Sequence, residues 1–120
     1  MKTSALRTTE LCYTEETRNL NYRIRCENLE DFRNCVRYIG SYNEFSLEAV
    51  NRIILLLETI VPCRDLFFDI GREGSPVVYV KTYVGNIKSM FGVLLEANGK
   101  KYVADEIGIE DQFSLRLWFD

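Results

Sequence analysis

A chain of 120 residues with 47% hydrophobic and 28% charged side chains has the composition of one globular domain, not of a disordered segment. Its net charge of −3 excludes a general attraction to nucleic acid, although a local basic patch stays open. The chain contains no histidine, which excludes Ser-His-Asp and Cys-His catalysis within it.

The N-terminal sequence and the cysteines indicate the compartment. Residues 1–17 lack the apolar core of a secretion signal, and the longest apolar run, residues 53–61, is too short to span a bilayer. We therefore expect a cytoplasmic protein. The cysteines form no CxxC pair, so buried reduced thiols are favoured over a zinc site or disulfides. The four cysteines are Cys12, Cys26, Cys35 and Cys63.

The first elements in chain order are a loose segment and two short strands. We expect one domain over residues 1–120, with residues 1–8 as a loose N-terminal segment. Residues 9–14 predict a short strand, and residues 20–26 predict a half-buried strand because apolar and polar side chains alternate. The apolar face would hold Leu20, Tyr22, Ile24 and Cys26, and the polar face Asn21, Arg23 and Arg25.

A helix is predicted at about residues 28–39, where the apolar period changes to three and four. Asn28 is a suitable N-cap, and Asp31 favours the same helix end. Gly40 suits the left-handed conformation that ends a helix. The apolar stripe consists of Leu29, Phe32, Val36 and Ile39.

A second helix is predicted at about residues 46–61. Ser46 is its N-cap, and Phe45 and Val50 form a hydrophobic staple around it. Pro62 sets its end. Leu55 and Leu56 would widen an already broad apolar face, so we expect this helix to be the most buried one.

From residue 63 onward the chain is expected to form strands. The sequence GREGSP at residues 71–76 predicts a hairpin loop, and Ile70 opposite Pro76 would place Phe67 against Tyr79 and Asp65 against Lys81. Leu66, Phe68, Val78 and Val80 would then share the core face. An anion site on the glycine-rich loop is disfavoured because no helix follows it.

Two further strands are expected around a second turn. Asn98-Gly99 is the strongest short hairpin signal, and it would pair Glu96 with Lys101 across two strands. The last strand, residues 113–119, would point alternate side chains into the core. These core residues are Phe113, Leu115, Leu117 and Phe119.

The predicted fold is α+β, in the order β-α-α-β-β-β-β-β. A mainly antiparallel sheet of five to six strands would carry both helices on one face. Its other face would be an ordinary surface, a protein interface or a nucleic-acid platform, because aromatic and cationic side chains alternate on it. The candidates there are Arg23, Arg25, Phe67, Tyr79, Lys81, Tyr83, Arg116 and Trp118. If the last strand lies at an edge of the sheet, a homodimer is open through edge pairing.

An acidic segment before the last strand is the second candidate region. It could be a solvated loop, a surface for a basic partner, or a metal site, although its spacing does not match an EF-hand. Its members are Asp105, Glu106, Glu110 and Asp111. Asp65 and Asp69 lie too far apart along one strand for a glycosidase pair.

These observations favour a small acidic non-enzymatic protein-binding module. In size and charge the chain resembles the inhibitor or immunity-type proteins of phages and mobile elements, which implies a protein partner, such as a basic nucleic-acid-handling enzyme. The alternative is a single-stranded nucleic-acid binder that uses the aromatic and basic sheet face. A second alternative is a small-molecule binder or carboxylate-dependent enzyme. No cofactor and no metal are expected.

Overall fold

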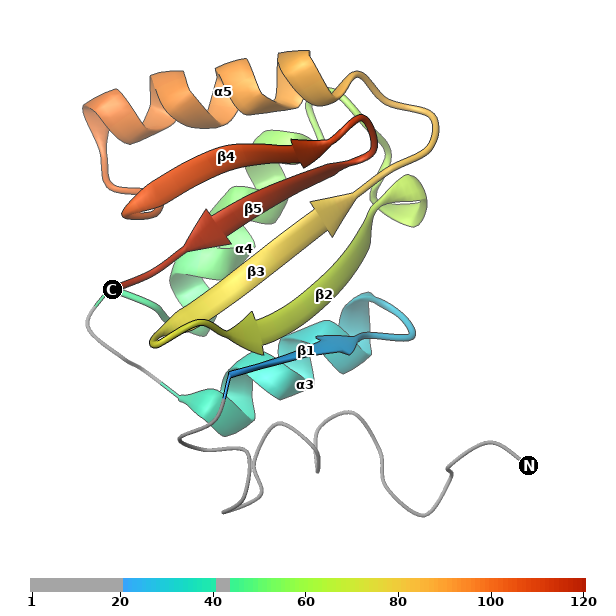
Figure 1. The fold of residues 1–120 in the computed structure, drawn as a ribbon. Helices are drawn as coiled ribbons and strands as arrows, with labels where there is room; N and C mark the ends of the chain where they lie inside the picture. Colours follow the sequence, from blue (N-terminus) through green and yellow to red (C-terminus); the bar gives the residue numbers. More distant parts are fainter. Residues whose placement is uncertain (1–20, 41–43) are drawn as a thin grey trace.

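The computed structural model describes residues 21–40 and 44–120, which contain one antiparallel sheet and three α-helices (Figure 1). Five strands follow the order β1-β2-β3-β5-β4, and every neighbouring pair is antiparallel. The strands are β1 (Tyr22–Arg25), β2 (Phe67–Arg72), β3 (Pro76–Lys81), β4 (Glu106–Asp111) and β5 (Ser114–Trp118). The helices are α3 (Leu29–Ile39), α4 (Leu47–Leu57) and α5 (Ile87–Lys100), with a 3-10 turn at Cys63–Asp65.

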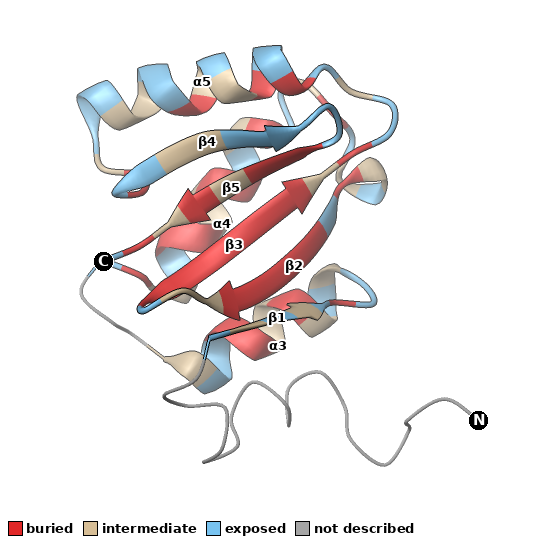
Figure 2. Ribbon diagram, in the orientation of Figure 1, coloured by how far each residue is buried: buried red, intermediate tan, exposed pale blue. Residues whose placement is uncertain are grey.

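The helices form one layer on one face of the sheet. Figure 1 shows α3 and α4 behind the strands and α5 alongside β4. All three helices share a single hydrophobic core with the inner face of the sheet, and Figure 2 shows that this burial is concentrated in the central strands. Within the core, Phe32 of α3 stacks on Phe68 of β2 with ring centroids 4.3 Å apart. The expected α+β fold with an antiparallel sheet is confirmed, with three helices instead of two.

Local capping signals predicted α3 and the start of α4 correctly. The Asn28 side chain accepts a hydrogen bond from the Asp31 backbone N–H at 2.7 Å, and Gly40 ends α3 with a φ of 76°. The Ser46 hydroxyl accepts from the Ala49 N–H at 3.1 Å. These contacts satisfy backbone donors that a helix start leaves without intrahelical partners.

Helix α4 ends four residues earlier than the sequence predicts. After Leu57, the N–H groups of Thr59 and Ile60 bond to carbonyls three residues back, which is a tighter turn than the α-helix. The Thr59 hydroxyl also donates to the Leu56 carbonyl at 2.6 Å. The expectation that Leu55 extends the buried face is wrong, because this side chain is 66% exposed.

The hairpin predicted at Asn98-Gly99 is wrong, because this dipeptide lies in the last turn of α5. Ile87, Met90 and Leu94 are buried at helical spacing, so the apolar period over 14 residues outweighs one turn-forming pair. The Asn98 side chain instead accepts the Val103 N–H at 2.6 Å and so shapes the turn after the helix. The element order is therefore β-α-α-β-β-α-β-β.

The predicted cross-strand pair between Glu96 and Lys101 is wrong for the same reason. Both residues belong to α5 or its C-terminal cap, and Glu96 is paired with Lys100 at 3.5 Å, one helical turn away. Such exposed pairs contribute only about 0.3–0.5 kcal/mol.

The β2–β3 hairpin has a tighter loop than expected. Arg72, not Ile70, lies opposite Pro76, which leaves a three-residue loop at 73–75 with Gly74 at a φ of 77°. Phe67 therefore faces Lys81 and Asp69 faces Tyr79, so both predicted cross-strand pairs are wrong. Asp65 is not in the strand but in the 3-10 turn. A shift of two residues preserves the face of every side chain, and the predicted core positions Leu66, Phe68, Val78 and Val80 are indeed buried.

The last strand, β5, lies between β3 and β4 and is not at an edge of the sheet. The expected edge position is wrong, and with it the stated route to a homodimer. Leu115, Leu117 and Phe119 are fully buried, but Phe113 is 41% exposed because it lies in the β4–β5 turn before the strand begins. The core prediction is therefore wrong at this one position.

Several predictions concern residues outside the described ranges. These are the loose segment at 1–8, the strand at 9–14, Leu20 and Cys12. Of the other cysteines, Cys26 and Cys35 are buried and Cys63 is half-buried.

Candidate functional site

The outer face of the sheet, opposite the helices, carries one row of residues that runs across all five strands, with side chains from four of them. The strand register aligns Arg25, Asp69, Tyr79, Arg116 and Gly108 across β1, β2, β3, β5 and β4. Within the described ranges, no helix or strand covers this face (Figure 1). The register places on it the predicted candidates Arg23, Arg25, Phe67, Tyr79, Lys81, Arg116 and Trp118.

Asp69 is the anionic centre of this face, and it is only 5% exposed. The Arg23 Nε atom lies 2.8 Å from its carboxylate, and the Lys81 Nζ atom lies 3.0 Å from it. Arg23 also binds Glu110 of β4 through both terminal nitrogens, at 2.7 and 3.1 Å. Its guanidinium carbon lies 3.7 Å from the centroid of the Tyr79 ring, a cation–π contact.

Glu73, in the β2–β3 loop, is a second anionic centre that sequence reasoning missed. Arg116 donates to its carboxylate through Nη2 at 2.6 Å and through Nε at 3.1 Å. The Tyr79 hydroxyl donates to the same carboxylate, and the Trp118 indole N–H donates to the Glu73 backbone carbonyl at 2.8 Å. Arg116 reaches Glu106 as well, at 3.2 Å. We call the ion pairs around Asp69 and Glu73 the outer-face network.

The pKa values in the network follow from these contacts. The hydrogen bond from Arg116 lowers the pKa of Glu73, despite the opposing effect of burial. Burial and the hydrogen bond to Glu73 raise the pKa of Tyr79. Burial acts against the charged form of Arg23, but its bonds to Glu110 and Asp69 outweigh this and raise its pKa. Near neutral pH, Glu73 is therefore ionised, Arg23 is protonated and Tyr79 is a neutral phenol.

The outer-face network leaves little of the predicted aromatic and cationic surface available. Arg23, Lys81 and Arg116 each pair with carboxylates, and Tyr79 is only 4% exposed beneath Arg23. Arg25 is exposed, and no carboxylate of the described chain is within ion-pair distance of it.

Exposed apolar side chains gather instead at one end of the sheet, where β2 begins and β3 ends. The Tyr83 ring contacts both Phe67 and Phe113, with centroids 5.9 and 5.1 Å apart. Next to them, Val84 and Ile109 line one hollow. We call Phe67, Tyr83, Val84, Ile109 and Phe113 the aromatic end; they are five of the eight exposed large hydrophobic residues that the structure describes.

The acidic segment does not form a single cluster. Asp105 accepts the Tyr102 hydroxyl and the Asp120 N–H, both at 2.7 Å, near the chain end. Glu106 and Glu110 belong to the outer-face network. Asp111 borders the aromatic end, where the Phe113 N–H donates to it at 2.8 Å and holds its pKa below the usual range.

The predicted candidates therefore separate into two sites. Arg23, Tyr79, Lys81, Arg116 and Trp118 lie in or beside the outer-face network, together with Glu106 and Glu110, and Arg25 lies in the same row. Phe67, Tyr83 and Asp111 lie at the aromatic end. The missed residues are Glu73, Val84, Ile109 and Phe113. The β2–β3 register places Asp69 opposite Tyr79 and leaves Glu73 in the loop, so no pairing pattern in the sequence indicates the role of Glu73.

Wider comparisons add no candidate chemistry. The described residues contain no group of three or more histidine, cysteine or acidic side chains arranged for a metal ion. None of the described helices is long and apolar enough to cross a membrane. Comparisons with protein-family models, curated proteins and solved structures gave no significant match to this chain.

Proposed function

We propose that this protein is a non-enzymatic binding module that contacts another protein through its aromatic end. The observation that carries the proposal is the contact of Phe67, Tyr83 and Phe113, whose rings remain 41%, 63% and 41% exposed. Burial in water-excluding partner pockets would stabilise such rings, and aromatic residues are enriched among interface hot spots. Single exposed apolar residues are ordinary, but a group of exposed rings in mutual contact, such as Phe67, Tyr83 and Phe113, is typical of a contact surface.

The acidic net charge of the chain favours a basic partner, and the hollow at the aromatic end is lined by one acidic and one basic side chain, Asp111 and Lys88. Asp111 is exposed and stays ionised because of the hydrogen bond from the Phe113 N–H. The chain as a whole carries −3, so long-range attraction also favours a cationic surface. The specific form of the proposal is an inhibitor or immunity-type protein of a phage or mobile element that acts on a nucleic-acid-handling enzyme.

The outer-face network supports this proposal as a scaffold. Asp69 and Glu73 cross-link the side chains of β1, β3 and β5 through Arg23, Lys81 and Arg116. Phe67 is the first residue of β2, the strand that carries Asp69, and Phe113 lies in the turn before β5. Rigid aromatic side chains on a fixed framework lose little conformational entropy on binding.

The nucleic-acid alternative receives less support. Base stacking needs an accessible ring face, but Tyr79 is buried and its ring is covered by Arg23. Phosphate binding needs cations without internal partners, and Arg23, Lys81 and Arg116 already bind carboxylates. A salt-sensitive quenching of Trp118 fluorescence by single-stranded oligonucleotides would favour this alternative over the protein-binding one.

The proposal is tested by quantitative affinity capture from extracts of the native host. The native chain should recover one protein in stoichiometric amount, and Tyr83→Ala and Phe113→Ala should each reduce recovery of that protein at least about tenfold, as expected of hot-spot residues. The matched control is Leu95→Ala, which removes an exposed apolar side chain of α5 outside the aromatic end.

The control distinguishes the loss of a specific contact surface from a general effect of removing an exposed apolar side chain. Leu95→Ala should leave recovery of the same protein unchanged. Equal recovery by the native chain and both aromatic variants would contradict the proposed surface, as would an equal loss in the control. A native chain that recovers no stoichiometric protein would contradict the proposed function itself.

A further inference from the structure

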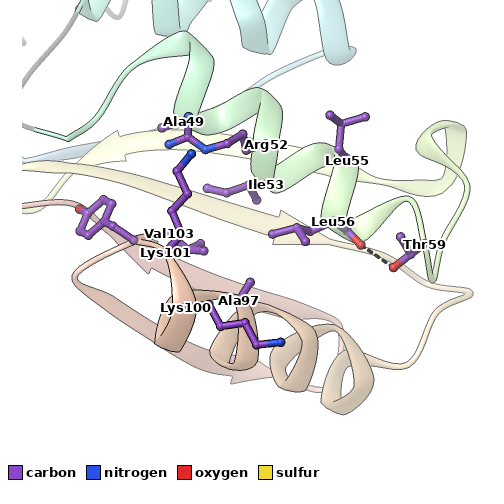
Figure 3. A pocket seen from close by; sticks show the side chains of 11 residues that line it. Ala49, Arg52, Ile53, Leu55, Leu56, Thr59, Ala97, Lys100, Lys101 and Val103 are labelled. Carbon is purple, nitrogen blue, oxygen red and sulfur yellow. Dashed lines mark hydrogen bonds between the residues drawn. The ribbon is translucent and has the colours of Figure 1, made fainter.

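A second surface feature lies in the helical layer, away from the aromatic end. Helices α4 and α5, with the chain that follows α5, enclose an open groove of about 420 Å³ (Figure 3). This volume is within the range of small-molecule sites. Its floor and walls are apolar, with Ala49, Ile53 and Val103 buried and Leu56 and Ala97 half-buried.

The rim of this groove carries positive charge and no carboxylate. Arg52, Lys100 and Lys101 line it, and in Figure 3 the Lys101 side chain extends toward the Arg52 guanidinium. Arg52 pairs at 3.2 Å with Glu48, and Lys100 pairs at 3.5 Å with Glu96, both outside the groove. Lys101 has no carboxylate within ion-pair distance among the described residues.

The structural role of these cations explains only part of the arrangement. Lys100 lies in the last turn of α5 and Lys101 is its C-cap, where the helix dipole favours cations. Arg52 is in the middle of α4, and no such effect applies to it. Its guanidinium lies near the Lys101 side chain beside the apolar floor (Figure 3), and Glu48, which pairs with Arg52, lies outside the groove, so an anion bound in the groove would be attracted by both cations.

The opposite end of the groove is apolar. Leu55 is 66% exposed there, and Leu56 and Thr59 complete the wall. Tyr102 also lines the groove, and burial together with its hydrogen bond to Asp105 raises its pKa, so it remains a neutral phenol. The groove thus has a cationic end and an apolar end.

We propose that this groove binds a small amphipathic anion, a carboxylate on an unbranched alkyl chain. The carboxylate would lie between Arg52 and Lys101, and the chain would lie over Ile53 and Leu56. The ligand class follows from the polarity of the groove: the apolar floor removes the chain from water, and the two cations pair with the head group.

Isothermal titration calorimetry with three probes tests this proposal on the full chain. Decanoate below its micelle concentration should bind at one site. Decyltrimethylammonium has the same chain length and the opposite charge, and it should bind about tenfold more weakly. Butyrate has the same head group and should bind about a hundredfold more weakly, because most of its apolar chain is missing.

Charge reversal provides the decisive variant. The double substitution Arg52→Glu and Lys101→Glu should reverse the preference, so that decyltrimethylammonium binds more tightly than decanoate. The matched control, Arg37→Glu with Arg64→Glu, makes the same change in net charge at exposed residues outside both the groove and the aromatic end, and it should retain the native preference.

Thermal melting of each variant identifies loss of fold. An unchanged preference in the groove variant would overturn the proposal. The same holds if the control loses decanoate binding equally, or if decanoate and decyltrimethylammonium bind the native chain alike. The aromatic end is not altered by these variants, so the protein-binding proposal can fail or succeed separately.

Discussion

Replacing Glu73 with alanine removes the carboxylate that accepts hydrogen bonds from two other side chains of the outer-face network, Arg116 and Tyr79. Arg116 loses contacts at 2.6 and 3.1 Å, and the Tyr79 hydroxyl loses its acceptor. A hydrogen bond to a charged group contributes about 1.5–3 kcal/mol when buried. The Glu73 side chain is 39% exposed and that of Arg116 28%, so solvent screening reduces this value. We expect a net loss of about 1–2 kcal/mol.

The assay is urea unfolding followed by the fluorescence of Trp118, the one tryptophan in the chain. Its indole N–H donates to the Glu73 backbone carbonyl, which the substitution keeps, so the folded emission should not shift. The unfolding midpoint should fall, and the melting temperature should fall by about 5 °C. Glu73→Gln retains an acceptor without the charge, so we expect an intermediate loss.

The pH dependence of stability is a second test of the interaction between Glu73 and Arg116. The pKa of Glu73 is lower in the folded chain than in the unfolded chain, so its contribution is present above the ordinary glutamate pKa and is lost as the pH falls through its folded pKa. The difference between native and Glu73→Ala should therefore shrink in acid. If Glu73→Ala lowers the free energy of unfolding by less than about 0.5 kcal/mol at neutral pH, or if its effect does not change with pH, the Glu73 carboxylate does not stabilise the fold through these contacts.

Two other predictions concern packing and alkaline pH. Gly85→Ala would place a Cβ 2.2 Å from Val61 Cγ2, so thermal melts should show a loss of stability of about 1–3 kcal/mol. Gly92 lies inside α5 with open space around it, so Gly92→Ala should stabilise the fold by about 0.5–1 kcal/mol. Equal effects of the two substitutions would contradict the packing at Gly85. Because the pKa of Tyr79 is raised on folding, the unfolded chain releases its phenolic proton first, and stability should fall as the pH rises above about 10. In urea titrations at rising pH, Tyr79→Phe should weaken that dependence, and an unaltered slope would count against the buried phenol.

Features determined by neighbouring residues were predictable from the sequence. The caps at Asn28 and Ser46 involve bonds across three residues, so the start of each helix could be located. The alternation in β1 assigned Arg23 and Arg25 to the outer face. The local Asn98-Gly99 signal misled because a longer apolar period competes with it in α5.

Features determined by contacts between distant segments could not be predicted. Glu73 acquires its role from Arg116, which is 43 residues away, and only the observed register brings the two together. Phe113 has the alternation of a core residue, but the turn before β5 exposes it. The groove is formed by segments around residues 49–59 and 97–103, and neither segment indicates it alone.

Site-specific photocrosslinking in native-host cells tests directly whether the aromatic end contacts another protein. A benzophenone side chain would replace Tyr83 at the aromatic end in one variant and Tyr38 of α3, which is 48% exposed, in the control. If the aromatic end is the contact surface, we expect one discrete crosslinked protein from position 83 and no crosslink to that protein from position 38. A protein contact at the aromatic end would be contradicted if the protein were crosslinked from position 38 and not from position 83, or if no protein were crosslinked from either position.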